Sequence, residues 1–152
     1  MPTNKSKTAK IISVTNQKGG VGKTTTTINL AAALSELEKK VLIIDLDPQG
    51  NASTGLGVEV ADRELSTYEF LVEGVPLEKV AMETEISGLS IVPATIDLSS
   101  ADIDLISNEK RSHLLHEALR KKQENKQKYD YILIDCPPSL NILTVNAMVA
   151  SH

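Results

Sequence analysis

A glycine-rich segment near the amino terminus constrains the fold of this chain more than any other feature. Residues 18–25 spell Lys-Gly-Gly-Val-Gly-Lys-Thr-Thr, after an apolar run at residues 10–15 that predicts a strand and before residues 24–37, which predict a helix. Glycines at a strand-to-helix turn let backbone N–H groups surround phosphate oxygens, and the helix amino terminus adds partial positive charge. The segment therefore predicts a polyphosphate-binding loop at the end of a strand.

The loop departs from the common pattern Gly-x-x-x-x-Gly-Lys-[Ser/Thr] at its first position. Gln17 stands where that pattern has glycine, and a second lysine, Lys18, stands beside the loop. Within the loop, Lys23 can reach the β- and γ-phosphates of a nucleotide, and the Thr24 hydroxyl can ligate Mg²⁺. The residues predicted to contact the phosphates or the metal are Gly19, Gly20, Val21, Gly22, Lys23 and Thr24.

The rest of the chain alternates apolar runs with helical segments. Residues 41–44 form a continuous apolar run without alternation, which is typical of a parallel strand buried on both faces. Further strands are predicted at residues 89–92 and 131–134, helices at residues 66–72, 99–106, 110–122 and 143–152, and a loop at residues 50–57. Strands that alternate with helices predict an α/β fold in which helices flank both faces of a parallel sheet.

Two finer expectations concern the packing and capping of helices. Leu30, Leu34 and Leu37 lie at helical spacing and predict the packing face of the first helix. Ser139 follows two prolines that force a turn, so it can cap the last helix.

Acidic residues follow two of the predicted strands. Asp135 comes directly after three apolar residues, where an acid at the tip of a strand can hold Mg²⁺ directly or through water; a turn or capping aspartate is the alternative. The side chains of Asp45 and Asp47 share one face if their strand extends that far, and an ordinary Asp-Pro turn is the alternative. Because ligands bind beyond the carboxyl ends of parallel strands, the loop and these acids are expected to meet at one edge of the sheet.

Three ordered motifs resemble the deviant Walker A family of P-loop ATPases, the ParA/MinD/Soj group, and within it the chromosome- and plasmid-partitioning ATPases. The motifs are NQKGGVGKTT at residues 16–25, DLDPQGN at residues 45–51 and IDCPPS at residues 134–139. Their order and spacing are highly specific, and matching segments extend the resemblance over nearly all of the chain after the first ten residues.

The resemblance implies roles that the residue types alone do not. Lys18 looks like the signature lysine, which reaches across a dimer to the nucleotide of the other subunit, and Thr25 is expected at the α-phosphate. Asp47 is implied to position or activate the attacking water, with Asp45 near the metal. The implied catalytic residues are Lys18, Lys23 and Asp47, and the implied metal-linked residues are Thr24, Asp45 and Asp135.

The resemblance also implies a function. A partition ATPase of this kind binds ATP with Mg²⁺, forms an ATP-dependent homodimer, binds DNA non-specifically and is stimulated by a ParB-like centromere-binding protein. It acts in chromosome or plasmid segregation, in the cytoplasm and associated with the nucleoid.

Family members are longer than 152 residues, so the chain is expected to be an N-terminal part. Residues 1–9 are expected to form a flexible basic arm and residues 10–152 part of the ATPase domain, with DNA binding mainly in the missing part.

Composition and charge bear on several other classes of protein. The net charge of −4 supplies no overall attraction to DNA or to an anionic membrane, and a single cysteine excludes an intramolecular disulfide. No segment approaches the roughly 18 consecutive apolar residues of a membrane span. Cys136 is interpreted as a small buried apolar residue, and His113 and His116 as packing or surface residues that lack a third metal ligand.

Three alternatives stay open. Other deviant Walker A proteins include metabolic ligases, tyrosine kinases and nitrogenase reductase-like proteins; the last need cluster-ligating cysteines, and the motif at residues 45–51 favours the partition branch. A second alternative is a fragment that binds nucleotide without turnover or serves only as a partner-binding module. A MinD-like membrane-cycling ATPase is the third, but it would need a basic amphipathic terminal helix that these residues do not contain, so no membrane partner is expected.

Overall fold

Strands and helices alternate along the described part of the chain. The structure, a computed structural model, describes residues 9–15, 22–125 and 128–152, without the side chains of residues 121–125. The strands are β1 (Lys10–Val14), β2 (Val41–Asp45), β3 (Met82–Glu83), β4 (Leu89–Val92) and β5 (Tyr131–Asp135). The α-helices are α1 (Lys23–Glu36), α2 (Asn51–Gly55), α3 (Thr67–Val72), α4 (Leu77–Val80), α5 (Ala101–Asp104), α6 (Leu114–Asn125) and α7 (Ile142–Ala150). Short 3₁₀ helices are η1 (Val60–Asp62), η2 (Ile96–Ser100) and η3 (Arg111–His113). Within the described residues, no helix combines the length and the apolar character that a bilayer span requires.

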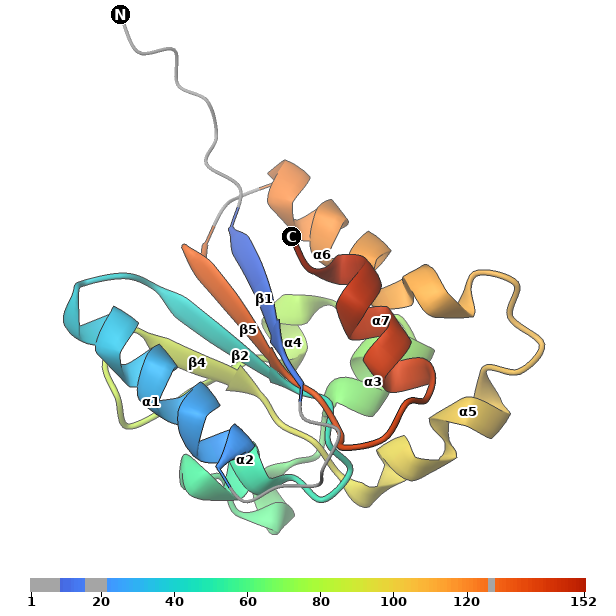
Figure 1. The fold of residues 1–152 in the computed structure, drawn as a ribbon, viewed down its shortest axis with the longest axis horizontal. Helices are drawn as coiled ribbons and strands as arrows, with labels where there is room; N and C mark the ends of the chain where they lie inside the picture. The colour runs from blue at the N-terminus through green and yellow to red at the C-terminus, as the bar shows by residue number, and fades with distance from the viewer. Residues whose placement is uncertain (1–8, 16–21, 126–127) are drawn as a thin grey trace, which may run out of the picture.

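The strands form one sheet in the order β1-β5-β2-β4-β3 (Figure 1). Neighbours among β1, β5, β2 and β4 pair in parallel, whereas β3 pairs antiparallel with β4. The predicted parallel sheet is therefore confirmed for four strands, and the sheet as a whole is mixed because of β3, which was not predicted. Only residues 84–88 separate β3 from β4, too few for the crossover that a parallel neighbour needs.

Helices cover both faces of the sheet, as predicted. In β2, Leu42 and Ile44 join a core covered by α3 to α7, whereas Val41 and Ile43 join a core covered by α1 and α2 (Figure 1). All four side chains have no solvent-exposed area. The unbroken apolar run thus corresponds to a central strand that is buried on both sides.

The first helix packs through a face that the leucine spacing did not predict. Leu30 and Leu37 are exposed at 38% and 69%, and of the three predicted leucines only Leu34 packs against a core. The buried positions of α1 include Thr27 and Ala31, which lie four residues apart. Their side chains are small, so the helix approaches the strands closely through the face that also carries the loop lysine.

Three other local expectations differ from the structure. Residues 50–57, predicted as a loop, contain α2. The last helix is capped by Asn141, whose side chain accepts hydrogen bonds from the N–H groups of Leu143 and Thr144, and not by Ser139. Ala9, placed in the expected basic arm, is buried at 2% exposure, while residues 1–8 of that arm lie outside the described residues.

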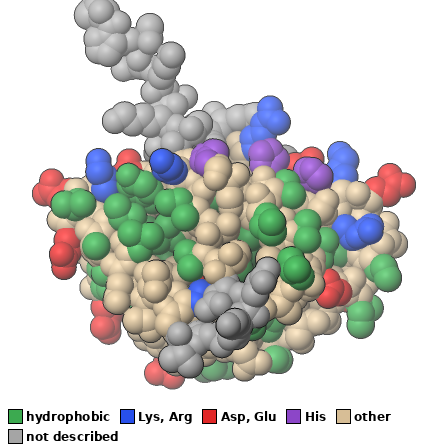
Figure 2. All heavy atoms as spheres, viewed as in Figure 1, with side chains coloured by type: hydrophobic (Ala, Val, Ile, Leu, Met, Phe, Trp, Pro, Cys, Tyr) green, Lys and Arg blue, Asp and Glu red, His purple; other side chains and the backbone are tan. Residues whose placement is uncertain are grey.

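Charged side chains of both signs share the surface. On the face drawn in Figure 2, the Lys and Arg side chains of the described residues are scattered along the upper edge and the right side, and one lies well inside the face; acidic side chains stand mostly at the edges. The described residues form no continuous basic patch on this face, in keeping with the net charge of −4.

The carboxyl ends of three strands lie side by side, because β5 sits between β1 and β2. In the register of the sheet, Val14 pairs with Asp135, and Asp135 pairs with Asp45. The glycine-rich loop follows β1 directly. The expectation that the three motifs meet at one edge of the sheet is therefore confirmed for their described residues.

Candidate functional site

The helix α1 begins at the glycine-rich loop, and its first turn carries three predicted site residues. Gly22 precedes the helix with a φ of 113°, a left-handed conformation that suits glycine. Lys23 and Thr24 are the first two residues of α1, and Thr25, the third, is exposed. The remaining predicted loop residues fall within residues 16–21, outside the described residues: Lys18, Gly19, Gly20 and Val21.

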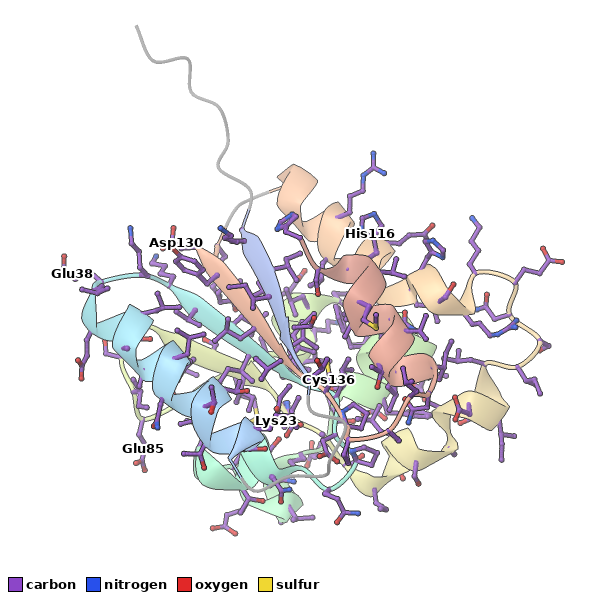
Figure 3. All side chains as sticks on the ribbon, viewed as in Figure 1. Lys23, Glu38, Glu85, His116, Asp130 and Cys136 are labelled. Atoms are coloured by element: carbon purple, nitrogen blue, oxygen red, sulfur yellow. The ribbon has the colours of Figure 1, made fainter. Side chains whose placement is uncertain are left out.

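Asp135, at the end of β5, binds three side chains of α1. Lys23 Nζ forms a buried ion pair with Asp135 Oδ1. Thr24 Oγ1 donates to Asp135 Oδ2 at 3.1 Å, and Thr27 Oγ1 donates to Asp135 Oδ1 at 3.3 Å. Lys23 and Cys136 lie at the same end of the sheet, whereas Asp130 marks the opposite end of β5 (Figure 3). The fold thus brings the loop lysine, a hydroxyl and the predicted strand-end acid into direct contact.

Thr27 is a site residue that the sequence analysis missed. Its hydroxyl also donates to the Lys23 carbonyl oxygen at 3.1 Å. It follows Lys23 by four residues and Thr24 by three, so helical geometry places the three side chains on one face. The run of four threonines at residues 24–27 is the sequence feature that could have indicated a role for Thr27.

The ion pair between Lys23 and Asp135 is buried on both sides, with exposed side-chain fractions of 4% and 0%. Such a pair adds little net stability, because desolvation offsets the attraction between the charges. Loss of one partner is costly, however, since the other charge is left buried and unpaired, at about 3–5 kcal/mol. The ammonium group is therefore held at the carboxyl edge of the sheet, beside the amino terminus of α1, where an anion is favoured.

Asp45, at the end of β2, is buried among hydrogen-bond donors. Its Oδ2 accepts from Ser53 N at 3.0 Å and from Ser53 Oγ at 2.7 Å, and its Oδ1 accepts from Asp47 N at 3.1 Å. Burial raises the pKa of Asp45 from its ordinary 3.8 to about 7, and the negative charge of Asp135 acts in the same direction, while the hydrogen bonds lower it. Ser53, in α2, was not singled out from the sequence, because nothing in its spacing distinguishes it from the neighbouring polar residues.

The raised pKa of Asp45 predicts a pH-dependent stability. Between about pH 4 and pH 7 the folded protein holds a proton on Asp45 that the unfolded chain has released, so the free energy of unfolding is expected to fall as the pH rises. The fall is up to about 4 kcal/mol and ends near pH 7. Chemical denaturation at a series of pH values measures it.

The expected change of the free energy of unfolding with pH arises from the carboxyl group of Asp45 alone, so a matched pair of variants isolates this contribution. Asp45→Asn is expected to flatten the curve between pH 4 and pH 7, and Asp62→Asn, which alters an exposed acid in η1, is expected to leave it unchanged. Equal slopes in the parent and Asp45→Asn would contradict the assignment.

Asp47 lies in the turn that follows β2. The strand ends at Asp45, so strand alternation does not extend to Asp47 and the condition for a shared face is not met. Asp47 Oδ1 accepts from Gln49 N at 3.0 Å, and the Asp47 carbonyl oxygen accepts from Gly50 N at 2.8 Å. The side chain is only 5% exposed, so the turn holds this carboxylate in one place.

Oxygen atoms that suit Mg²⁺ gather around Asp135. The Thr24 hydroxyl and the Asp135 carboxylate lie 3.1 Å apart, and both are hard oxygen ligands. Asp45 fits a more remote role, because three donors already engage its carboxylate. The described residues contain no group of three or more His, Cys, Asp or Glu side chains able to hold a metal. The Thr24 hydroxyl and the Asp135 carboxylate therefore fit a Mg²⁺ ion that takes further ligands from phosphate oxygens.

Cys136 is a buried free thiol, as its sequence context indicated. Burial raises the pKa of the thiol to about 12, so almost none of it is the reactive thiolate at neutral pH. This supports a packing role beside the site.

The chain matches a known protein family over almost its whole length. A family model described as an AAA domain matches residues 9–152. The chain belongs to this family. Among its relatives, the sporulation initiation inhibitor protein Soj of Bacillus subtilis is 51% identical over 142 residues, which are 93% of this chain and 55% of that protein. The chromosome partitioning protein ParA of Caulobacter vibrioides is 49% identical over 142 residues, which are 93% of this chain and 53% of that protein. This AAA domain thus spans about half the length of the curated relatives.

Solved structures share the fold of this AAA domain. A plasmid partition protein of Borrelia burgdorferi, bound to AMPPNP, has a TM-score of 0.82 and 32% identity, covering 94% of this chain and 58% of that one. The cobyrinic acid a,c-diamide synthase of Mycobacterium smegmatis, with bound ADP and magnesium, has a TM-score of 0.88 and 39% identity. The match covers 95% of this chain and 57% of that one. The α/β fold of a P-loop protein is therefore shown by sequence and by structure.

Proposed function

We propose that the protein binds and hydrolyses ATP with Mg²⁺ as a partition ATPase. The observation that carries the proposal is the convergence of Lys23, Thr24 and Asp135 at the amino terminus of α1. These are the group types that bind a polyphosphate and its metal ion. Solved relatives that hold ADP or an ATP analogue with magnesium support the ligand, and the partition proteins among the relatives support the cellular role.

Each residue contributes through its position and charge. Phosphate oxygens of the nucleotide replace Asp135 as the acceptor of the Lys23 ammonium group, while Thr24 and Asp135 are the residues that would hold the ion. When bound, magnesium supplies positive charge that offsets the charge of the transferred phosphoryl group. Asp47, fixed in its turn, orients the attacking water, and the N–H groups at the start of α1 face the phosphates.

Assembly and partners form a further part of the proposal. The resemblance of residues 16–25 supports an ATP-dependent homodimer in which Lys18 meets the nucleotide of the other subunit. Non-specific DNA binding is assigned mainly to parts of the protein outside these residues, since the net charge of −4 supplies no overall attraction to DNA. A ParB-like centromere-binding protein is the proposed stimulating partner, and the proposed location is the cytoplasm, at the nucleoid.

Lys18→Ala is expected to separate nucleotide binding from turnover. The variant should bind Mg-ATP with nearly the parental affinity, because Lys23 and the loop amides remain. It should lose the ATP-dependent dimer, and turnover should fall about 10²-fold, the usual loss when one donor aimed at developing charge is removed. Light scattering gives the mass, and phosphate release gives the rate. Lys79→Ala, at an exposed position of α4, is the control, and an unchanged dimer and rate in Lys18→Ala would contradict the role.

A ligase is the second candidate function, because a synthase shares 39% identity and a TM-score of 0.88 with this chain. Product analysis distinguishes the two. A partition ATPase releases ADP and phosphate from ATP alone, and DNA with the centromere-binding partner raises the rate. A ligase would need an acid and an amine acceptor and would form a new amide. Binding of ATP without phosphate release would support nucleotide binding alone.

A further inference from the structure

Arg63 is a buried arginine beside the turn that carries Asp47. It follows η1 and is only 7% exposed. Its guanidinium donates to Val58 O from Nε at 3.2 Å and from Nη2 at 2.6 Å, to Ala94 O from Nη1 at 3.1 Å, and to Thr54 Oγ1 from Nη2 at 3.0 Å. No carboxylate of the described residues forms an ion pair with it.

The acceptors of Arg63 lie in segments that surround the acidic residues of the site. Thr54 belongs to α2, Val58 follows α2, and Ala94 follows β4. Ala94 also donates its N–H to Ser53 Oγ at 3.0 Å, and Ser53 Oγ donates to Asp45 Oδ2 at 2.7 Å. A continuous series of contacts thus runs from the guanidinium to Asp45.

The guanidinium also lies directly against the turn at Gly50. Gly50 has a φ of 67°, and a Cβ at this position would come within 2.5 Å of Arg63 Nη1 and 3.2 Å of Ala94 O. Gly50 N donates to Asp47 O at 2.8 Å, and Thr54 N donates to Gly50 O at 2.9 Å. The turn that presents Asp47 is therefore fixed between α2 and Arg63.

Packing alone does not explain a charged group at this position. Burial of a guanidinium costs desolvation free energy, and apolar side chains of similar volume often replace buried ions without loss of stability. Arginine differs from them because it offers five donors in a rigid planar arrangement. At this position the donors join three chain segments at one point.

We propose that Arg63 is a positioning residue that holds Asp45 and Asp47 in place for ATP hydrolysis. It acts through Ser53 and the Gly50 turn and does not itself contact the nucleotide. The inference rests on the proposed ATPase function, and it adds a residue outside all three motifs to the machinery of that site.

Arg63→Lys in the full-length protein tests the proposal. Lysine keeps the positive charge, but its single ammonium group cannot reproduce the planar set of hydrogen bonds to Val58, Ala94 and Thr54. A displacement of about 1 Å at the acids can reduce turnover about 10²-fold, so kcat is expected to fall at least about tenfold. KM for Mg-ATP should stay within about threefold, because the loop and Lys23 supply uniform binding. Arg111→Lys, at an exposed arginine in η3, should leave both constants unchanged.

A second variant and a structural measurement guard against a simple folding defect. Thr54→Val removes one acceptor of Arg63 at an exposed position, so it leaves the fold intact and should lower kcat in the same direction by a smaller factor. Amide hydrogen exchange should accelerate at residues 46–58 in Arg63→Lys and remain unchanged in β5.

The outcomes are distinguishable. A lower melting temperature with unchanged kcat in folded Arg63→Lys and Thr54→Val proteins would overturn the positioning role and leave the proposed function standing. A rise in KM at constant kcat would overturn it too. Absence of ATP hydrolysis in the parent protein would overturn the proposed function and this inference together.

Discussion

Replacement of Lys23 by alanine is expected to weaken Mg-ATP binding about 10- to 100-fold and to destabilise the nucleotide-free protein at the same time. A hydrogen bond to a charged phosphate contributes about 1.5–3 kcal/mol, and about 1.4 kcal/mol corresponds to a factor of ten in affinity. In the nucleotide-free fold the same ammonium group pairs with buried Asp135, so its removal should lower the free energy of unfolding by about 3–5 kcal/mol. Calorimetry measures the affinity, and chemical denaturation measures the stability.

A second substitution separates the two effects of losing Lys23. Asp135→Asn in the Lys23→Ala background removes the unpaired buried charge, so most of the stability should return while the affinity for ATP stays low. Lys79→Ala, in α4, is the matched exposed control and should change neither quantity. A Lys23→Ala protein as stable and as tightly binding as the parent would contradict both assignments for this lysine.

Asp47→Asn is expected to abolish most ATP hydrolysis while ATP binding is retained. The asparagine side-chain oxygen can still accept the hydrogen bond from Gln49 N at the turn, so the variant removes the charge of Asp47 with little change in its geometry. Loss of a group that activates or orients the attacking water reduces the rate about 10²- to 10⁴-fold. Single-turnover phosphate release measures the rate, and calorimetry measures the dissociation constant.

The role assigned to Asp47 requires that Asp47→Asn lower the rate of ATP hydrolysis without lowering the affinity for ATP. Asp97→Asn, which alters an exposed acid in η2, is the control and should hydrolyse ATP at the parental rate. If Asp47→Asn also turned ATP over at the parental rate, the water-activating group would have to be sought elsewhere in the site. If it lost binding and turnover equally, the side chain would contribute to affinity instead.

The layers of the fold could be predicted because the central strands carry a local signature. The unbroken apolar run at residues 41–44 indicated a strand buried on both faces, and β2 has this environment. The helix predicted at residues 66–72 likewise corresponds to α3, which begins after Ser66, whose side chain forms a capping box with Glu69. The short elements β3, α2 and α4 could not be predicted, since two to five residues carry too little periodicity to distinguish a helix or strand from a turn.

The packing face of α1 was predicted wrongly for a tertiary reason. Leucine spacing treats apolar residues as the buried ones, yet this helix presents Lys23 and Thr27 to the sheet because they meet Asp135 there. Leu30 and Leu37 are exposed instead, and Leu37 is the C-cap residue that follows the last turn of α1.

The site could be predicted only as far as its motifs extend. Lys23, Thr24 and Asp135 follow recognisable patterns, and the sheet register brings them together as expected. Ser53 and Arg63 belong to no motif, and their contacts with Asp45 and the Gly50 turn depend on how α2 packs beside the end of β2 and the residues after β4. Residues of this kind can be assigned to the site only from the three-dimensional structure.

Titration of the full-length protein with ATP in a calorimeter, first with Mg²⁺ and then with the ion chelated, tests the central claim most directly. Saturable binding of one nucleotide per chain that weakens when the ion is removed, and that falls at least about tenfold in Lys23→Ala, is the predicted result. A protein that is folded by circular dichroism and shows no magnesium-dependent affinity for a nucleoside triphosphate would contradict the assignment of this site.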